Sequence, residues 1–244
     1  MTLLNTTAQS IWNLREIIMP KEGLVEPNRK QVEFAKRESE ILKAAISLFE
    51  GPRWETITVE QISKKAEIGK GTVYKHFTCK EEIYANIATE FSKRILDAYD
   101  VIDFEPQIEE QAVMDSIQQL IRISFDLFLN NPVEAKMSFY CKRADFRERL
   151  TDDIRQQFEA LDAQFEAYIG AILQRGIEMG LFPAMPVEHL MMGLEATFDG
   201  AIGMIWNGDI NCQSVTDQET YVNIISEFMI AGLIGLKNKQ KGAV

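Results

Sequence analysis

The chain has 244 residues, 46% of them hydrophobic, which is enough apolar material for one large helical unit or two small domains. Its formal net charge of −11 argues, for the chain as a whole, against binding of a polyanion such as nucleic acid. Three widely spaced cysteines, Cys79, Cys141 and Cys212, form neither a disulfide framework nor a metal-ligand spacing and are typical of a reducing cytoplasm. We expect a cytoplasmic protein without membrane association, because no signal peptide and no apolar stretch of ~18 residues is evident.

Residues 1–28 are predicted to be an N-terminal extension. Ile11, Leu14 and Ile18 lie at i, i+3 and i+7, on one face of a possible helix, and Pro20 ends that pattern. Two interpretations stay open: a floppy extension, or an extra helix that docks on DNA or on the rest of the protein.

The segment from Arg29 to Glu50 is predicted to be one long helix that ends at Gly51-Pro52. Its apolar positions are Phe34, Ile41, Leu42, Ala45, Leu48 and Phe49. From Arg29 to Lys80 the chain carries 11 Lys and Arg against 7 Asp and Glu, a net charge of +4, so the remainder carries −15. A small basic module on a strongly acidic body indicates a local footprint for a polyanion.

Thr58 to Lys80 is predicted to hold two short helices and the start of a third. Thr58 suits an N-cap, because its side-chain oxygen can accept a hydrogen bond from a free amide of the first turn. Val59, Ile62 and Ala66 then form one buried stripe. Gly69 tolerates positive φ in the turn, and a second helix follows from about Lys70 to Phe77.

The second of these helices has one apolar side and one polar side. At roughly 100° per residue, Val73 and Phe77 face the core. Gly71, Thr72 and Lys75 lie opposite them, with Tyr74 and His76 on the two flanks. No acidic residue occurs between Glu67 and Glu81, and the polar groups present can bond base edges and phosphates. The pattern is typical of a helix-turn-helix whose second helix enters the major groove.

These residues resemble the DNA-binding signature of the TetR family of bacterial transcriptional repressors. The shared positions are Ile62, Ala66, Lys70-Gly71-Thr72-Val73-Tyr74, His76-Phe77 and Lys80-Glu81-Glu82-Ile83, and the likeness continues upstream through Ile41 to Phe49. The resemblance covers about a quarter of the chain. It implies that double-stranded DNA is bound by Thr58, Lys70, Gly71, Thr72, Tyr74, Lys75, His76 and Lys80, with Lys80 on a phosphate.

Three positions depart from the family pattern. Glu67 stands where a flexible glycine is usual, and Gly69 replaces a serine whose hydroxyl could bond phosphate. Cys79 replaces a serine that would cap the next helix, a role that Thr78 can take.

The rest of the chain reads as helices without strand-like alternation. They span about Lys80–Asp100, Gln111–Leu129, Val133–Cys141, Thr151–Met179, Val187–Trp206 and Gln218–Lys237. We therefore predict an all-α fold, with a three-helix helix-turn-helix domain over residues 29–79. A larger helical domain for effector binding and dimerisation follows over residues 80–244.

Two functional surfaces of that larger domain are implied by the resemblance. The family's fourth to seventh helices surround an effector cavity, and large apolar residues stand there that are either core or pocket: Phe91, Ile95, Phe125, Phe128, Tyr140, Phe158 and Phe165. The last two helices, rich in Gly, Ala and Met, are expected to form a homodimer interface, with burial inside one chain as the alternative.

No catalytic constellation, metal-ligand motif or phosphate loop is evident, so we expect no enzyme, no metal and no cofactor. The sequence thus predicts a dimeric, ligand-responsive repressor of a near-palindromic operator, released by a small apolar or aromatic effector. An activator or DNA-organising protein of the same fold, or an apolar-ligand carrier without DNA binding, stays open as an alternative.

Overall fold

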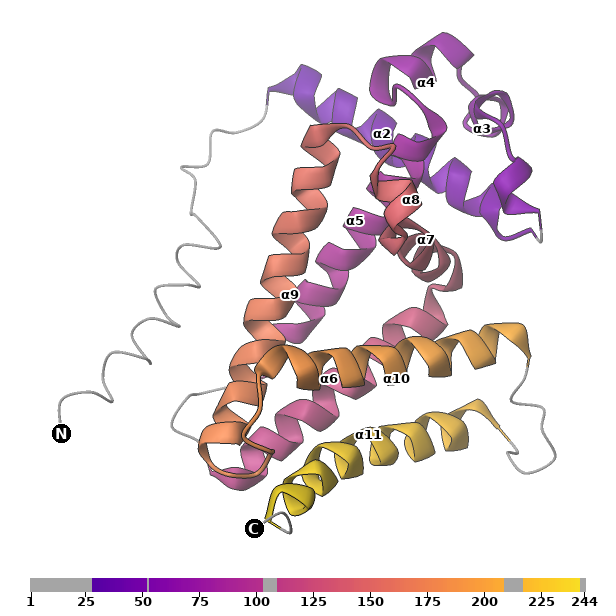
Figure 1. Ribbon diagram of the computed structural model, residues 1–244. Coiled ribbons are helices and arrows are strands. Elements are labelled where there is room, and N and C mark those ends of the chain that lie inside the picture. Colours follow the sequence, from indigo (N-terminus) through magenta and orange to yellow (C-terminus); the bar gives the residue numbers. More distant parts are fainter. Residues whose placement is uncertain (1–27, 52, 103–108, 209–216, 242–244) are drawn as a thin grey trace. The chain divides into compact units, whose positions relative to one another are not determined.

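The computed structural model describes residues 28–51, 53–102, 109–208 and 217–241 (Figure 1). The all-α prediction is confirmed, because every regular element in these ranges is a helix. The predicted N-terminal extension lies outside the described residues, apart from Asn28. None of the described helices is long and apolar enough to cross a membrane.

The chain divides into two compact units. Unit 1 comprises residues 1–88 and 137–155, and unit 2 comprises residues 89–136 and 156–244. The helices of the first half are α2 (Arg29–Phe49), the short 3-10 helix η1 (Trp54–Thr56), α3 (Val59–Lys65), α4 (Lys70–His76) and α5 (Lys80–Tyr99). Those of the second half are α6 (Glu110–Asn130), α7 (Pro132–Lys142), α8 (Ala144–Arg147), α9 (Asp152–Glu178), α10 (Val187–Asn207) and α11 (Gln218–Lys241).

In unit 1, α3 packs on both α2 and α4. The core is formed by one apolar stripe from each helix: Ile41, Ala45 and Phe49 of α2, Val59 and Ile62 of α3, and Val73 of α4 with the following Phe77. Thr58 caps α3 as predicted, since its Oγ1 accepts from the Gln61 amide at 3.2 Å and Gln61 Oε1 accepts from the Thr58 amide at 2.8 Å.

In the turn between α3 and α4, positive φ occurs at Glu67 and not at Gly69, where the sequence predicted that it would be tolerated. Gly69 has φ −69° and serves as the N-cap of α4, whereas Glu67 takes the left-handed conformation with φ +55°. The turn is closed by backbone bonds from the Ile68 amide to the Ser63 carbonyl at 3.0 Å and from the Glu67 amide to the Lys64 carbonyl at 3.2 Å. The left-handed residue thus follows directly on the C-cap of α3, at position 67. A glycine would be less strained there than glutamate.

An aromatic cluster joins residues 137–155 to the helix-turn-helix residues of unit 1. The Tyr140 ring centroid lies 5.2 Å from that of Trp54, 5.9 Å from that of Tyr84 and 5.1 Å from that of Phe146, and Tyr84 also contacts Phe49 at 5.1 Å. The compact unit therefore extends past the domain boundary expected at Lys80 and includes α8, a four-residue helix that periodicity does not reveal.

In unit 2, α6 is the helix on which α10 and α11 pack. Its buried stripe includes Val113, Ile117, Leu120, Ile121, Phe125 and Phe128. Phe198 of α10 lies over this stripe, with ring centroids 4.8 Å from Phe125 and 4.9 Å from Phe128. Helix α10 therefore packs against α6 through contacts between aromatic rings.

Buried hydroxyls in unit 2 are satisfied within it. The Tyr99 and Ser124 hydroxyls are 2.7 Å apart, Ser124 Oγ donates to the Leu120 carbonyl at 2.7 Å, and Tyr168 Oη donates to the Tyr99 carbonyl at 2.6 Å. Burial raises the pKa of Tyr99 to about 12.

The C-terminal end of α9 is fixed by two glycines. Gly180 takes φ +68°, which lets the Leu181 amide donate to the Gly176 carbonyl at 2.8 Å. The Phe182 ring then folds back over Gly176, so close that a Cβ at position 176 would lie 2.2 Å from Phe182 Cδ2. Phe182 is 2% exposed, which makes this return a tightly packed part of the core.

Candidate nucleic-acid interface

The exposed side of α4 carries most of the residues predicted to bind DNA. Lys70, Gly71 and Lys75 are exposed, Tyr74 is 46% exposed, and Thr72 is half-buried. The opposite side is fully packed, since Val73 and Phe77 are 0% and 3% exposed. The helix therefore offers a hydroxyl, a phenol and two cations to solvent, with no acidic residue among them.

Gly71 is not required by the packing of the protein. Among the described residues, a Cβ built at this position meets no neighbouring atom within 4 Å, so this part of the fold has room for a small side chain there. A glycine at such a place allows a close approach of another molecule to the backbone of the helix.

Thr58 and Lys80 take part in hydrogen bonds within unit 1. Thr58 Oγ1 caps α3, which places its side chain at the start of the first helix of the motif. Lys80 Nζ donates to the Glu55 carbonyl at 2.7 Å and lies 5.3 Å from the centre of the Tyr84 ring. Lys80 thus ties the first residue of α5 to η1, and its ammonium retains further N–H donors for another acceptor.

His76 stands apart from the exposed side of α4. Its side chain is only 7% exposed and faces α2, with the ring centroid 4.0 Å from that of Phe34 and Nδ1 3.6 Å from Glu38 Oε1. The structure therefore brings Lys70, Gly71, Tyr74 and Lys75 together on one surface and places His76 against α2.

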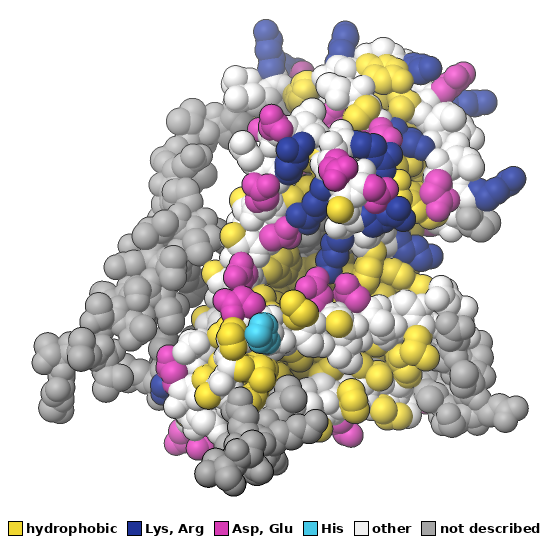
Figure 2. Space-filling model, in the orientation of Figure 1, with side chains coloured by type: hydrophobic (Ala, Val, Ile, Leu, Met, Phe, Trp, Pro, Cys, Tyr) yellow, Lys and Arg dark blue, Asp and Glu magenta, His cyan; other side chains and the backbone are white. Residues whose placement is uncertain are grey.

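Lys and Arg side chains gather over α2, α3 and α4 of unit 1 (Figure 2). Lys64 and Lys65 end α3, and Lys75 and His76 end α4. Some of the positive charge on α2 is offset locally, because Arg37 pairs with Glu40 at 2.7 Å and Arg29 with Glu33 at 3.1 Å. The surface around α4 is consequently the more strongly basic part of the helix-turn-helix region.

The residues expected to line an effector pocket belong to both units. Those buried to 7% exposure or less are Phe91, Ile95, Phe125, Phe128 and Phe158, all in unit 2, and Phe165 of the same unit is half-buried. Tyr140 belongs to unit 1, where it packs in the aromatic cluster with Trp54 and Tyr84. The Tyr140 ring contacts Trp54, Tyr84 and Phe146, which all belong to unit 1.

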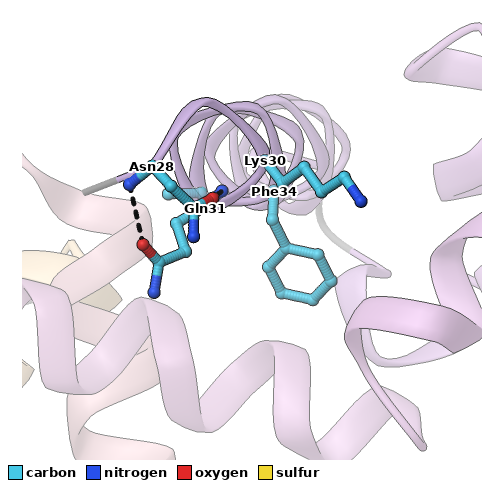
Figure 3. Close-up of a pocket in the computed structure, with 5 residues that line it drawn as sticks. Asn28, Lys30, Gln31 and Phe34 are labelled. Atoms are coloured by element: carbon cyan, nitrogen blue, oxygen red, sulfur yellow. Dashed lines mark hydrogen bonds between the residues drawn. The ribbon is translucent and has the colours of Figure 1, made fainter.

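A surface hollow of about 360 Å³ lies at the start of α2 (Figure 3). It is lined by Asn28, Lys30, Gln31, Phe34 and Ala35. The polar groups on one side are already paired, since the Asn28 amide donates to Gln31 Oε1 at 2.8 Å and Asn28 Oδ1 accepts from the Gln31 amide at 3.0 Å. All of its lining residues belong to the first two turns of α2 and to the N-cap of that helix.

The two described cysteines differ in their environment. Cys79 is exposed, whereas Cys141 is buried. Burial raises the pKa of the Cys141 thiol to about 12, and the nearby Arg147 only partly opposes this effect. A thiol held in its neutral form is a poor nucleophile. In the described ranges no group of three or more His, Cys, Asp and Glu residues could hold a metal ion.

The helices α10 and α11 leave an apolar surface uncovered within unit 2, which we call the C-terminal face. Large hydrophobic residues on it are strongly exposed: Met192 (66%), Met204 (43%), Ile224 (50%), Phe228 (67%) and Ile234 (41%). Small exposed residues stand between them at Gly193, Ala196, Gly200, Ala231, Gly232 and Gly235. Hydrophobic side chains are visible over these two helices in Figure 2. Burial of both helices inside one chain, the alternative interpretation of the sequence, does not account for these exposed side chains.

Comparison with known proteins finds similarity to bacterial transcriptional regulators, in agreement with the resemblance noted in the sequence. Residues 41–87 match the family model described as bacterial regulatory proteins, tetR family. An HTH-type transcriptional regulator of Staphylococcus aureus (strain bovine RF122 / ET3-1) is 25% identical over 166 residues, which cover 64% of this chain and 85% of that relative.

Solved structures share the fold. A bacterial regulatory protein of the tetR family from Rhodococcus RHA1 superposes with a TM-score of 0.64 at 17% identity, over 81% of this chain and 97% of its own. The TetR family transcriptional regulator PfmR from Thermus thermophilus superposes with a TM-score of 0.59 at 18% identity, over 79% of this chain and 96% of its own. The likeness thus extends well beyond the helix-turn-helix residues.

Proposed function

We propose that the chain is a transcriptional regulator of the TetR family and acts as a homodimeric repressor of a near-palindromic operator. A small apolar or aromatic effector releases it from that operator. The single observation that carries this proposal is the exposed side of α4, a basic and hydroxyl-bearing surface on a helix whose other side is packed in the core.

The residues of α4 have distinct roles in this proposal. Lys70 and Lys75 neutralise phosphates, because they are exposed cations with no acidic residue on their helix. Tyr74 and Thr72 contact base edges, the former through its exposed phenol. Gly71 lets the helix backbone approach the groove, since no other described residue comes within 4 Å of a Cβ built there.

Two further residues support the contact from outside α4. Thr58 caps α3 and offers its hydroxyl oxygen at the edge of the motif. Lys80 holds the start of α5 to the Glu55 carbonyl and directs its remaining N–H donors to a phosphate. Both residues act at the boundary of the helix-turn-helix, where backbone contacts set its register on the duplex.

The C-terminal face supports the dimer. Five large hydrophobic side chains exposed by 41% or more on two adjacent helices are unusual for a surface in water. Small residues between them permit close approach of a second copy, and a twofold axis places the same face on both partners. A dimer also presents two α4 helices, as a near-palindromic site requires.

The effector is assigned to unit 2, where the buried aromatic residues are concentrated. The proposed lining is Phe91, Ile95, Phe125, Phe128, Phe158 and Phe165. Because five of these six side chains are at most 7% exposed, an apolar effector has to move them apart when it binds. Binding then favours a different arrangement of the unit 2 helices, and release of DNA follows from the different operator affinities of the two arrangements.

The test is a selection of binding duplexes from a random library, followed by fluorescence anisotropy titrations at several salt concentrations. Lys75→Ala is expected to lower the slope of log affinity against log salt by about 1 for each phosphate that the variant no longer neutralises. Lys93→Ala, an exposed lysine of α5 in unit 2, serves as the matched control. Failure to select any duplex, or equal slopes for both variants and the wild type, would contradict the proposal.

A further inference from the structure

We infer that His76 is a positioning residue: held by Phe34 and Glu38 of α2, it fixes the C-terminal end of α4 and with it the angle at which α4 meets DNA. This inference rests on the proposed DNA-binding function. It assigns to α2 a part in operator recognition that the helix-turn-helix signature does not contain.

The geometry at His76 is that of an internal contact. It is the last residue of α4, and its side chain is 7% exposed. The imidazole lies over Phe34, with ring centroids 4.0 Å apart and planes inclined by 33°. Its Nδ1 makes no hydrogen bond in the described part of the chain and faces Glu38 Oε1 at 3.6 Å. Phe34 and Glu38 are one helical turn apart, so they form one docking position for the ring.

Phe34 is otherwise a poorly placed aromatic residue. It is 48% exposed, and every residue from 28 to 36 is exposed, so this half of α2 has little burial of its own. Figure 3 shows the ring projecting from α2 into the hollow beside Lys30. The stacking on His76 is the contact that explains a phenylalanine at this place, because it covers one side of an apolar ring.

Helix α4 needs such an anchor because little else fixes its ends. It has seven residues, too few to be stable without tertiary contacts. Its N-cap is Gly69, which has no side chain to bond the first turn, and the preceding turn contains the left-handed Glu67. Val73 and Phe77 hold the packed side of the helix, whereas His76 adds a third contact, on α2. Three points determine an orientation where two still allow rotation.

A direct phosphate contact by His76 is the competing interpretation. It requires the ring to leave Phe34, because a side chain exposed by 7% has almost no surface for another molecule. The facing Glu38 carboxylate also disfavours an incoming phosphate. The two interpretations predict different results for His76→Phe, since a phosphate contact needs an N–H donor, which phenylalanine lacks, whereas the packing contact needs only an aromatic ring.

The test uses the full chain and a duplex that the wild-type protein binds. We expect His76→Ala and Phe34→Ala each to weaken operator affinity about tenfold, without changing the salt slope, because the number of phosphate contacts stays the same. The double variant should be no weaker than either single variant, since both remove the same stacking pair. His76→Phe preserves the stacking and should bind within about twofold of the wild type.

A second measurement needs no DNA. Amide hydrogen exchange at Phe77, whose N–H donates to the Val73 carbonyl at 2.9 Å, reports the opening of the last turn of α4. Phe34→Ala is expected to accelerate this exchange, and His76→Phe to leave it unchanged. The exchange result stands whether or not a duplex is found, so a failure of the proposed DNA binding can be told apart from a failure of the inference.

Three outcomes would overturn the inference. One is a salt slope lowered by His76→Ala together with unchanged binding by Phe34→Ala, which would establish a phosphate contact. Another is a double variant whose loss of affinity equals the sum of the single losses, and the third is an unchanged Phe77 exchange rate in Phe34→Ala. If His76→Ala does not fold, the comparison of Phe34→Ala with His76→Phe decides the matter alone.

Discussion

Replacing Phe228 with glutamate is expected to separate the proposed dimer into monomers. The side chain is 67% exposed on the C-terminal face of a single chain. Taking about 200 Å² for a phenylalanine side chain, roughly 130 Å² becomes buried in each copy when the faces meet. At about 25 cal/mol per Å², this burial contributes about 3 kcal/mol in each copy and about 6 kcal/mol in the dimer.

The glutamate removes this contribution and places a charge in an apolar surface, which adds a desolvation cost. We therefore expect the dimer dissociation constant to rise at least about a thousandfold, since each 1.4 kcal/mol corresponds to about a factor of ten. Sedimentation velocity over a wide range of protein concentration measures the change directly. Val101→Glu is the matched control, because Val101 is 72% exposed and lies outside α10 and α11.

The two variants should differ clearly in their association state. Phe228→Glu should sediment as a monomer with unchanged helix content, and Val101→Glu should remain a dimer. A wild-type protein that is monomeric at every concentration, or a Phe228→Glu variant as dimeric as the wild type, would refute the assignment of the C-terminal face.

Three further predictions concern the stability of the subunit. Glu67→Gly should raise the free energy of unfolding by about 0.5–1 kcal/mol, because φ +55° suits glycine, and a urea titration in which it proves less stable than the wild type would contradict this. Gly176→Ala should lower the free energy of unfolding by about 3 kcal/mol, since its Cβ would overlap the Phe182 ring. Gly170→Ala in the same helix, where the new Cβ meets its nearest atom at 3.6 Å, should change it little, and equal urea midpoints for the two alanine variants would argue against this packing. Burial raises the Cys141 pKa from 9.0 to about 12, so the folded state keeps a proton that the unfolded state loses. Stability should then fall as the pH rises above about 9, by up to about 1.4 kcal/mol per pH unit from this group, and Cys141→Ala should flatten that fall in pH-dependent urea titrations.

Most helices could be predicted because their signals are local. The N-cap at Thr58, the apolar stripe of α2 and the prolines and glycines between helices are properties of neighbouring residues, and the structure reproduces them within a few residues. The orientation of α4 was also accessible, because Val73 and Phe77 mark its packed side unambiguously.

Contacts between distant segments were not accessible in the same way. A helical wheel places His76 on a flank of α4, but whether that flank is open or covered depends on where α2 passes, which is a tertiary property. Tyr140 was recognised as a large apolar residue, yet nothing local indicates that Trp54 and Tyr84 are its partners. At Glu67 the family pattern gave the only hint of a left-handed turn residue.

The central claim, that the exposed side of α4 reads duplex DNA, is tested most directly by photo-crosslinking from position 74. Tyr74 is replaced with p-benzoylphenylalanine, a larger photoreactive aromatic residue that the exposed position can hold, in complex with a selected duplex. We predict cross-links to bases at two symmetry-related positions, and none from the same photoreactive residue placed at Val101. A protein that binds the duplex without any cross-link from position 74 would contradict the claim.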